Sequence, residues 1–471
     1  MNSRRLSIVL LLFILSFTLI LTGCGKDPNE KIELRIGFWP ENTETKDIAM
    51  YEIWKKQFEE EYPEYTIIAD HYTYDTSTVG SKYLTGTLPT VFETWFTEPQ
   101  KLMKNGYIRS ITNELKELGW DTMMDPNMKD SLTFGGEIYG IPRDGYGLGL
   151  LINTKTFIEN GLLEEDEDGK AILYDDEGKA LYPTTFEEIY EAAQVIADYS
   201  ETKGILICSA NKNGGWQFSN MVWNYGGELE TIDSSGRITA NLASPEAVRA
   251  LEWIKTMKQE ELLLNSPSVT YDQWYSSIGE KVAMAIVGSD ILQLAKTAGQ
   301  VEMDDLAFVP MPTGDGIHHY SLYGGTPFVF SAEATDEQVK GVLKFFEYTG
   351  RAPLVTDISK AAMEAGNNTA KAKNQPILPT IKPWINAEYV EYTNSLEKEY
   401  VTVDMYYYEE FFNNISNNKH AEVPYAAQEM YEYLDTAIQA VLVNPDTANV
   451  SALLQTANAK LQQFLDKNYN N

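Results

Sequence analysis

The stretch GGEIYGIPRDGYGLGLLINTKTF, residues 135–157, decides how the chain is organised, because its glycines allow two interpretations. A phosphate-binding loop would run from a strand directly into a helix, with its glycines around an anion. Here a Gly-Gly turn precedes a short Ile-Pro strand, and YGLGLLIN continues as an extended segment toward a helix that begins near Thr154. This order favours a crossing between two lobes, in which glycines absorb changes in φ and ψ.

Strand-like and helix-like segments alternate along most of the chain. β-branched and apolar runs predict strands at residues 32–39, 65–70, 89–95, 204–210, 279–289 and 304–312. Amphipathic segments predict helices at about 47–61 and 98–106, from Thr184, from Ser244-Pro245, and over much of the tail beyond Ala334. The first strand, helix and strand form a β-α-β unit, which implies a parallel sheet with a right-handed crossover. The alternation as a whole predicts an α/β architecture.

Two stretches interrupt this alternation. Residues 164–183 contain Asp-Gly and Glu-Gly pairs, which are typical of hairpin turns, and their acids lack the spacing of a calcium-binding loop. Residues 361–384 are polar and contain several prolines, so we expect an exposed loop there.

The first thirty residues carry the most specific motif in the chain. Arg4 and Arg5 precede an apolar run that ends at Leu21-Thr22-Gly23-Cys24, which is the pattern of a secretory signal. The sequence LTGC resembles the lipobox of bacterial lipoproteins, in which the cysteine is diacylated and becomes the new N-terminus. That resemblance implies a signal peptide at 1–23, lipidation of Cys24 and a lipid-anchored tether at 24–31. An ordinary signal or anchor helix with an incidental cysteine is the alternative.

The location that follows is the extracellular or periplasmic face of the cell membrane. Each buried CH₂ contributes about 0.8 kcal/mol, so two or three acyl chains would hold the protein firmly there. Cys208 is the other of the two cysteines and lies in an apolar stretch, so we expect a buried thiol and no internal disulfide.

Composition narrows the class of partner. The 471 residues carry a net charge of -32, which disfavours nucleic acid and anionic surfaces, because phosphate groups require Lys and Arg. With 43% hydrophobic residues the chain can bury large cores in two or three domains or lobes. The 29 Tyr and 9 Trp residues supply flat faces that suit sugar rings or peptides.

Motifs of the common catalytic classes are missing from the sequence, which has no GxxxxGK[ST], GxSxG, HExxH or CxxC. The adjacent pair His318-His319 lies in a Gly-rich turn, which favours a surface loop over a metal site. Carboxylates are abundant, so a glycosidase pair stays open as an alternative, although no pair stands out. We therefore expect a protein that is not an enzyme, with no catalytic residue, metal or cofactor.

Several segments, in a fixed order, resemble the extracellular solute-binding proteins of sugar ABC transporters (family 1, the maltose-binding-protein-like group). The first half contributes a strand that ends in Trp39, the helix end FEEEYP, YLTGTLPTVFETW, the crossing at 135–157, and YPTTFEEIYEAA with Phe186 in place of a tryptophan. The second half contributes WQFSNMVWNYGGEL, GEKVAMAIVGS, DDLAFVPMP, YGGTPFVFSA and TDEQVKGVLKFFEYTG. The similarity spans roughly residues 24–465 and rests on the order of the motifs.

The resemblance implies a two-lobed periplasmic-binding-protein-like fold of type II, with the ligand in a cleft between the lobes. The implied crossings lie at 143–150 and 323–326. The N-terminal lobe would comprise residues 32–144 plus 326–350, and the C-terminal lobe residues 145–325 plus 351–471. Ligands of α/β sheets lie beyond the carboxyl ends of the strands, which explains the place of the cleft.

Candidate ligand-binding residues also follow from the resemblance. They are Trp39, Glu41, Thr94, Trp95, Arg143, Asp144, Tyr146, Trp216, Asn220, Trp223, Asp290 and Tyr323. Tyr146 and Trp216 match places where family members contact sugar, and further candidates are Trp274 and the run 406–408. Asp290 stands where many relatives have a tryptophan, which removes one stacking platform and puts a maltodextrin ligand in doubt.

Several of these aromatic residues have a second interpretation. Trp223 lies two helical turns after Trp216, so both rings and Asn220 can share one face of a helix. A core stripe would show the same spacing, and Trp39 and Trp95 can equally be core residues. Arg143 can contact ligand or pair with a local acid.

The function that the resemblance implies is the carbohydrate-binding subunit of an ABC importer. Its partners would be a small carbohydrate and the membrane permease, with the chain itself a monomer. The number of aromatic residues favours a di- or oligosaccharide. A secreted carbohydrate-degrading enzyme and a receptor lipoprotein that presents peptides are the alternatives.

Overall fold

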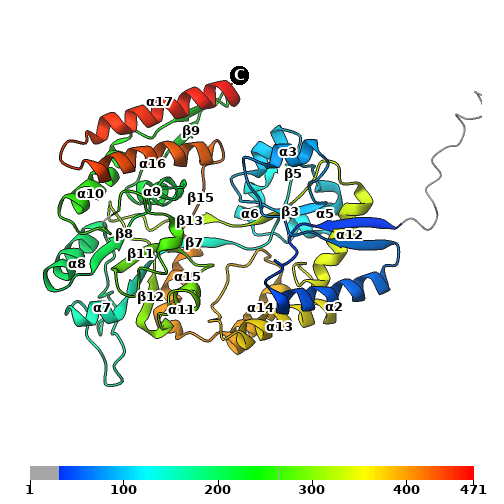
Figure 1. Cartoon of the computed structure of the whole chain (residues 1–471), viewed down its shortest axis with the longest axis horizontal. Coiled ribbons are helices and arrows are strands. Elements are labelled where there is room, and N and C mark those ends of the chain that lie inside the picture. The colour runs from blue at the N-terminus through cyan, green and yellow to red at the C-terminus, as the bar shows by residue number, and fades with distance from the viewer. Residues whose placement is uncertain (1–30, 265, 471) are drawn as a thin grey trace, which may run out of the picture.

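The computed structural model describes residues 31–264 and 266–470. The predicted signal peptide at 1–23, the lipidation site Cys24 and all of the tether except Lys31 lie outside the described residues. The described chain forms two lobes that lie side by side and are joined by a narrow waist (Figure 1).

The first lobe is built on a five-stranded sheet with the order β2-β1-β3-β14-β6. Its strands are β1 (Ile32–Ile36), β2 (Tyr65–Ala69), β3 (Val91–Glu93), β14 (Pro327–Phe330) and β6 (Ile141–Pro142). β2 and β3 run parallel to β1, whereas β14 is antiparallel to β3 and β6. Ile36 lies opposite both Ala69 and Val91, so the carboxyl ends of β1 and β2 meet at one edge.

The second lobe is built on a six-stranded sheet with the order β15-β13-β7-β11-β8, and β12 also pairs with β7. The strands are β7 (Tyr146–Asn153), β8 (Lys203–Leu206), β11 (Val282–Gly288), β12 (Leu306–Val309), β13 (Ser321–Gly324) and β15 (Lys419–Ala421). Residues of β7 and β11 are almost all buried, which is why both read as continuous apolar runs. Two small hairpins complete the strands: β4 (Thr133–Phe134) with β5 (Glu137–Ile138), and β9 (Glu230–Ile232) with β10 (Ile238–Ala240).

Helices surround both sheets (Figure 1). The first lobe carries α2 (Thr45–Glu61), α3 (Val79–Leu84), α4 (Pro99–Lys104), α5 (Thr112–Leu118), η1 (Trp120–Thr122), α6 (Pro126–Ser131), α12 (Asp336–Tyr348), α13 (Asp357–Ala372) and α14 (Ala387–Tyr400). The second lobe carries α7 (Thr154–Glu159), α8 (Phe186–Tyr199), α9 (Asn213–Asn224), α10 (Pro245–Gln259), η2 (Tyr271–Gln273), α11 (Leu294–Thr297), η3 (Met303–Asp305), η4 (Met405–Tyr407), α15 (Glu409–Ile415), α16 (Ala427–Val443) and α17 (Val450–Asn468). The α/β architecture and the two lobes predicted from the sequence are confirmed.

The start of a helix is often fixed by its cap. Thr185 and Glu188 form a reciprocal capping box at the start of α8. Ser244 accepts a hydrogen bond from the amide of Ala247 and precedes Pro245, the first residue of α10. Both starts coincide with those predicted from the sequence.

The chain changes from one sheet to the other at two neighbouring places. It leaves the first sheet after Pro142 and enters the second at Tyr146. It leaves the second sheet after Gly324 and returns to the first at Pro327. Both switches fall within the segments that the sequence analysis named as crossings.

The crossing glycines are required by close packing. A Cβ on Gly145 would lie 2.5 Å from Cε of Met128, and a Cβ on Gly325 would lie 2.5 Å from Cε2 of Phe96. Positive φ angles occur instead in the preceding turn, at 61° for Gly135 and 83° for Gly136. Glycine at the crossings therefore lets the two lobes approach closely, which differs from the torsional reason inferred from the sequence.

The tail does not belong wholly to the second lobe, which corrects the assignment of 351–471. Ala362, Trp384 and Tyr389 are buried in the apolar core of the first lobe, together with residues of α2 and α12. Leu378 and Ile381, between α13 and α14, touch the core of the second lobe, and buried residues of that core resume at Val403. A third connection between the lobes therefore lies between α14 and η4.

The exposed loop predicted at 361–384 is also wrong in part. α13 extends to Ala372, because Thr356 and Ser359 cap its start and alanines favour the helix. Trp384 is 1% exposed and packs edge-on against Trp120 at 5.8 Å. Residues 164–183 form two successive hairpin turns, with bridges between Glu165 and Ala171 and between Tyr174 and Ala180.

Candidate ligand-binding site

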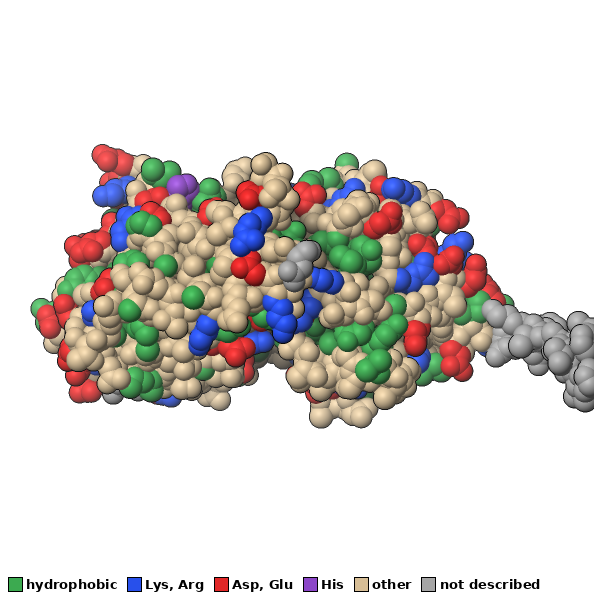
Figure 2. Space-filling view, turned by 90° about the horizontal axis from the view of Figure 1, so that it is seen from above, with side chains coloured by type: hydrophobic (Ala, Val, Ile, Leu, Met, Phe, Trp, Pro, Cys, Tyr) green, Lys and Arg blue, Asp and Glu red, His purple; other side chains and the backbone are tan. Residues whose placement is uncertain are grey.

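A pocket of about 360 Å³ lies between the lobes, beside both crossings. The first lobe contributes Trp95 and Thr97, and Thr326 comes from the second crossing. The second lobe contributes the remaining lining residues, which are Tyr146, Asn211, Lys212, Asn213, Trp216, Tyr271, Asp290, Ile291, Glu422, Gln428 and Tyr431. In the space-filling view, charged side chains of both signs gather near the junction of the two halves, and the outline is notched there (Figure 2). We call this space the interlobe pocket.

Aromatic rings form much of its wall. Tyr146 begins β7 and meets Trp216 of α9 edge-on, with ring centroids 6.0 Å apart. Trp216 in turn meets Tyr271 of η2 at 5.0 Å. On the other side, Trp95 follows β3, is 44% exposed and rests edge-on against Tyr74 at 5.3 Å. An exposed tryptophan that lines a pocket offers a free ring face to a ligand.

Two carboxyl groups lie at opposite ends of the Tyr146 ring. The hydroxyl of Tyr146 and Oε2 of Glu422 both lie within 3.0 Å of the place that a Cβ on Gly324 would take. At the other end, Cδ2 of Tyr146 and Oδ1 of Asp290 both lie within 3.5 Å of the place that a Cβ on Gly288 would take. Because Gly324 and Gly288 have no Cβ, both carboxyl groups can lie close to the Tyr146 ring.

The protein atoms around both carboxyl groups change their acidity. Desolvation and the Glu98 carboxylate raise the pKa of Glu422, the hydrogen bond from the Tyr431 hydroxyl, 2.7 Å long, lowers it, and the net value is about 7. The Asp290 side chain keeps contact with solvent, yet the surrounding pocket wall and the neighbouring Asp144 raise its pKa to about 6. Both groups are thus poised to exchange a proton near neutral pH.

Arg143 and Asp144 fasten the two crossings to each other. Arg143 pairs with Glu93 at 3.0 Å and with Asp144 at 2.6 Å. The backbone amide of Thr326 donates to Oδ1 of Asp144 at 3.1 Å, and Arg143 donates to the Thr326 hydroxyl at 3.3 Å. The ion pairs raise the pKa of Arg143 above its ordinary value, despite its burial. Of the two interpretations of Arg143, pairing with local acids is therefore the one that the structure displays.

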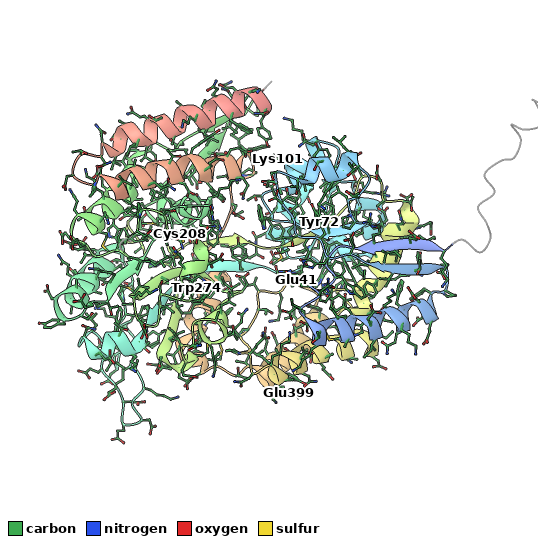
Figure 3. All side chains as sticks on the ribbon, viewed as in Figure 1. Glu41, Tyr72, Lys101, Cys208, Trp274 and Glu399 are labelled. Carbon is green, nitrogen blue, oxygen red and sulfur yellow. The ribbon has the colours of Figure 1, made fainter. Side chains whose placement is uncertain are left out.

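The rim of the pocket carries polar contacts that join the lobes. Lys101 of α4 pairs with Glu429 of α16 at 2.8 Å, and Gln428 donates to the hydroxyl of Thr97 at 3.2 Å. Lys101 lies at the edge of the first lobe that faces the second (Figure 3).

Of the twelve residues named from the sequence, Trp95, Tyr146, Trp216 and Asp290 line the interlobe pocket, and eight do not. Arg143 and Asp144 hold the crossings together, and the other six are buried or point elsewhere. Trp39, Thr94, Asn220, Trp223 and Tyr323 are buried, and Glu41 is exposed at 3.5 Å from His71. Asn220 holds β13 in place, because its amide donates to the carbonyl of Tyr320 and its oxygen accepts from the amide of Leu322. Trp223 stacks on His420 at 3.8 Å, so the helix that brings Trp216 to the pocket carries Trp223 into the core. Trp274 and Tyr407–Tyr408 are core residues as well, whereas Tyr406 is partly exposed.

The sequence analysis missed Glu422, Tyr271, Gln428 and Tyr431. Tyr271 lies in a short 3-10 turn, and the other three follow β15, a strand of three residues. Gln428 and Tyr431 lie in the first turns of α16, whose periodic pattern predicts a helix but not which of its residues face a pocket, and the short segments that hold Tyr271 and Glu422 have no periodic pattern. Long-range packing of α16 against α9 brings them to the pocket.

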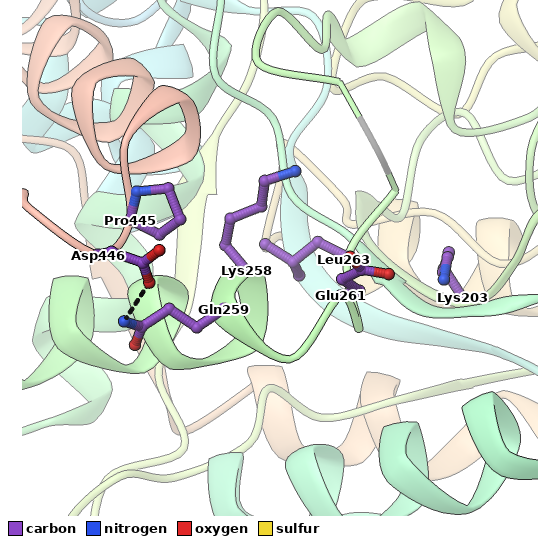
Figure 4. A pocket seen from close by; sticks show the side chains of 7 residues that line it. All are labelled: Lys203, Lys258, Gln259, Glu261, Leu263, Pro445 and Asp446. Atoms are coloured by element: carbon purple, nitrogen blue, oxygen red, sulfur yellow. Dashed lines mark hydrogen bonds between the residues drawn. The ribbon is translucent and has the colours of Figure 1, made fainter.

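Other features of the described residues are less suited to ligand. A hollow of about 260 Å³ is lined by Lys203, Lys258, Gln259, Glu261, Leu263, Pro445 and Asp446, lies within the second lobe and has no aromatic side chain (Figure 4). In the described part of the chain, no group of three or more His, Cys, Asp or Glu side chains is placed to hold a metal ion. No described helix has both the length and the apolar character that a membrane span requires.

Solved structures share the fold at low identity. The ABC substrate-binding protein Lmo0181 from Listeria monocytogenes, in complex with cycloalternan, is 12% identical, with a TM-score of 0.67 over 93% of this chain and 100% of its own. A solute-binding protein from Thermotoga lettingae, bound with α-D-tagatose, is 18% identical, with a TM-score of 0.66 over 93% and 100%. Maltose-bound MalE3 of T. maritima is 18% identical, with a TM-score of 0.64 over 92% and 99%.

Sequence comparison gives a family assignment. A search of the curated proteins found no match. The family model described as bacterial extracellular solute-binding protein matches residues 54–382, which is more than half of the chain. Its order of motifs, its two sheets and its interlobe pocket agree with that match. The chain belongs to the bacterial extracellular solute-binding protein family.

Proposed function

We propose that this protein captures a carbohydrate in the interlobe pocket and delivers it to the permease of an ABC importer. The observation that carries the proposal is that Trp95 of the first lobe and Trp216 of the second line one pocket together with Glu422 and Asp290. Flat rings cover the apolar faces of a sugar, while carboxyl and amide groups exchange hydrogen bonds with its hydroxyls. A volume of about 360 Å³ suits a disaccharide or part of a longer chain.

Support also comes from the bound sugars of the structurally similar proteins, which include cycloalternan, tagatose and maltose. In this proposal the protein is a monomer without catalytic activity. It is anchored outside the cytoplasmic membrane through Cys24, whose replacement by alanine would release the protein from the membrane fraction.

Capture would be coupled to closure of the lobes. We assign the chain up to Pro142, and from Pro327 to α14, to the first lobe, and the rest of the described residues to the second. The hinge would then comprise 143–145, 325–326 and the connection after α14. A sugar that touches both Trp95 and Trp216 gains contacts only when the lobes are close, so it stabilises the closed form that a permease can distinguish.

The test is a thermal-shift screen of the processed protein against mono-, di- and oligosaccharides, followed by calorimetric titration of each hit. Ligand that binds the native state raises the apparent melting temperature. The proposal predicts reversible binding of a sugar without turnover. Hydrolysis products would instead support a glycan-degrading enzyme, and shifts by peptides alone would support a peptide receptor.

A further inference from the structure

Glu422 differs from the other groups of the interlobe pocket in the way its charge is compensated. Its Oε1 accepts a hydrogen bond from the Tyr431 hydroxyl at 2.7 Å, and its Oε2 lies beside the Tyr146 hydroxyl above Gly324. A carboxylate removed from water is costly unless a cation or several hydrogen bonds compensate it.

Among the described residues, no Lys or Arg side chain is placed to compensate the charge of Glu422. The groups that shift its pKa are the burying protein atoms, the Tyr431 hydroxyl and the Glu98 carboxylate, and none of these is a cation. Arg143 is paired with Glu93 and Asp144, and Lys101 with Glu429. Lys212 lines the pocket, but the carboxylate whose pKa it lowers is Glu98.

Asp290, at the other end of the Tyr146 ring, differs in this respect. Arg143 lies close enough to lower its pKa, partly offsetting burial and Asp144. Asp290 therefore has a cation of the protein in reach, and Glu422 does not.

The rings around Glu422 add to the attraction for positive charge. Tyr146 and Tyr431 lie against the carboxyl group, and Trp216 and Trp95 line the same pocket. Aromatic faces attract cations through their quadrupole, most strongly where water is excluded. A carboxylate and several rings in one pocket favour an ammonium group over a hydroxyl, because charge-assisted hydrogen bonds are stronger than neutral ones.

We infer that the interlobe pocket selects a saccharide with a protonated amino group, and that Glu422 is the residue that binds this amino group. Asp290 then binds sugar hydroxyls at the far end of the Tyr146 ring. The inference rests on the proposed capture of sugar and narrows it to amino sugars.

The experiment compares sugars that differ only at one substituent. Chitosan oligomers of two to six units carry amino groups, chitin oligomers carry acetamido groups and cello-oligosaccharides carry hydroxyls on the same β-1,4 backbone. Glucosamine and galactosamine with glucose and galactose provide matched monosaccharides. Each is titrated calorimetrically into the wild type, Glu422→Gln and Asp290→Asn at about pH 6.5, where the amino sugars still carry ammonium groups and pairing with ammonium favours the ionised form of Glu422, whose pKa is about 7.

The inference predicts that the wild type prefers the amino form by about tenfold or more over both neutral forms. Glu422→Gln should abolish this preference while it still binds the neutral sugars. Asp290→Asn should weaken the three forms to a similar extent and keep the preference.

The acidity of Glu422 gives a second readout. Its pKa of about 7 means that affinity for an amino sugar should rise as pH increases toward about 7, because the ionised carboxylate is the form that pairs with ammonium, and should fall again where the amino group of the sugar loses its proton. The rise should be smaller in Glu422→Gln, where only Asp290, with a pKa of about 6, still ionises in this range. Groups that face Glu422 are Glu98, Tyr146 and Tyr431, and the tyrosines stay protonated throughout this range, because their pKa values are raised.

Three outcomes overturn the inference, and they distinguish its failure from that of the proposed function. Binding of neutral sugars without preference for amino forms, or a preference that survives Glu422→Gln, contradicts the role of Glu422 and leaves the capture of sugar intact. Failure of every saccharide to bind contradicts both.

Discussion

Lys101 of α4 and Glu429 of α16 form an ion pair of 2.8 Å that joins the two lobes at the rim of the interlobe pocket. Gln428, adjacent to Glu429, donates a second interlobe hydrogen bond to Thr97, which precedes α4. Both contacts can exist only when the lobes are close, so the pair favours the closed form.

Loss of this pair should therefore weaken ligand binding. Lys101→Ala should lower the affinity for the captured ligand by about two- to fivefold, the range of a partly exposed pair, and should raise the radius of gyration of the free protein. Small-angle scattering and calorimetry measure the two effects. The charge-swapped double variant Lys101→Glu with Glu429→Lys should recover most of the affinity.

A matched control is Lys56→Ala, because Lys56 pairs with Glu60 at 3.9 Å on the exposed surface of α2. It should change neither affinity nor radius. Equal behaviour of the Lys101 and Lys56 variants would contradict a role of the rim pair in closure.

Close packing at the second crossing should make Gly325 sensitive to a single methyl group. A Cβ there would collide with the carbonyl of Asp144 and with the Phe96 ring. Gly325→Ala should lower the free energy of unfolding by about 1–3 kcal/mol, because overpacking forces the backbone to move. Urea denaturation measures the change.

Gly366 provides the opposite case, because it lies inside α13 and a Cβ there would meet no atom within 4 Å. Gly366→Ala should raise the free energy of unfolding by about 0.5–1 kcal/mol. If Gly325→Ala were as stable as the wild type, the close approach at the crossing would be wrong.

Glu230 should make the stability of the protein depend on pH. Both of its carboxyl oxygens are buried and no described side chain donates to them, and burial raises its pKa to about 8, although the backbone amide of Tyr425 partly offsets the shift. Because the native pKa exceeds the ordinary value of 4.5, the folded state binds an extra proton between about pH 4.5 and 8. Stability from this group is complete at low pH and is lost as pH rises through that window.

Glu230→Gln keeps the shape of the neutral acid and cannot ionise. It should match the wild type at about pH 5 and exceed its free energy of unfolding by about 1–3 kcal/mol at about pH 9. Urea titrations at both pH values measure this, with exposed Glu201→Gln as the control. An identical pH profile for wild type and Glu230→Gln would show that Glu230 is ionised in the folded state.

The sequence predicts the fold better than the site, for a physical reason. Caps are local, so the start of α8 was predictable from a few adjacent residues, whereas the place of the sheet change near Tyr146 came from the family resemblance. Much of α13 was predicted as a loop, because its many polar residues are typical of loops although its alanines favour a helix. Which lobe it joins depends on contacts with α2 and α12 that no local pattern contains.

Site residues illustrate the same limit. Trp216 and Trp223 lie two turns apart on α9, so the sequence places them on one face of the helix. In the structure Trp216 lines the pocket and Trp223 stacks on His420. Glu422 was not predictable, since it follows a three-residue strand and reaches the pocket only through the packing of α16. The lipobox at Cys24 lies outside the described residues and stays a prediction.

Calorimetric titration of wild type and Trp216→Ala with the sugar found by the screen tests the central claim most directly. The account predicts that the wild type binds this sugar reversibly and that Trp216→Ala lowers the affinity by about ten- to a hundredfold, because a stacking ring is lost from the pocket wall. Trp253→Ala, which removes a tryptophan outside the pocket, should leave the affinity unchanged. Full affinity in Trp216→Ala would contradict binding of the sugar in the interlobe pocket.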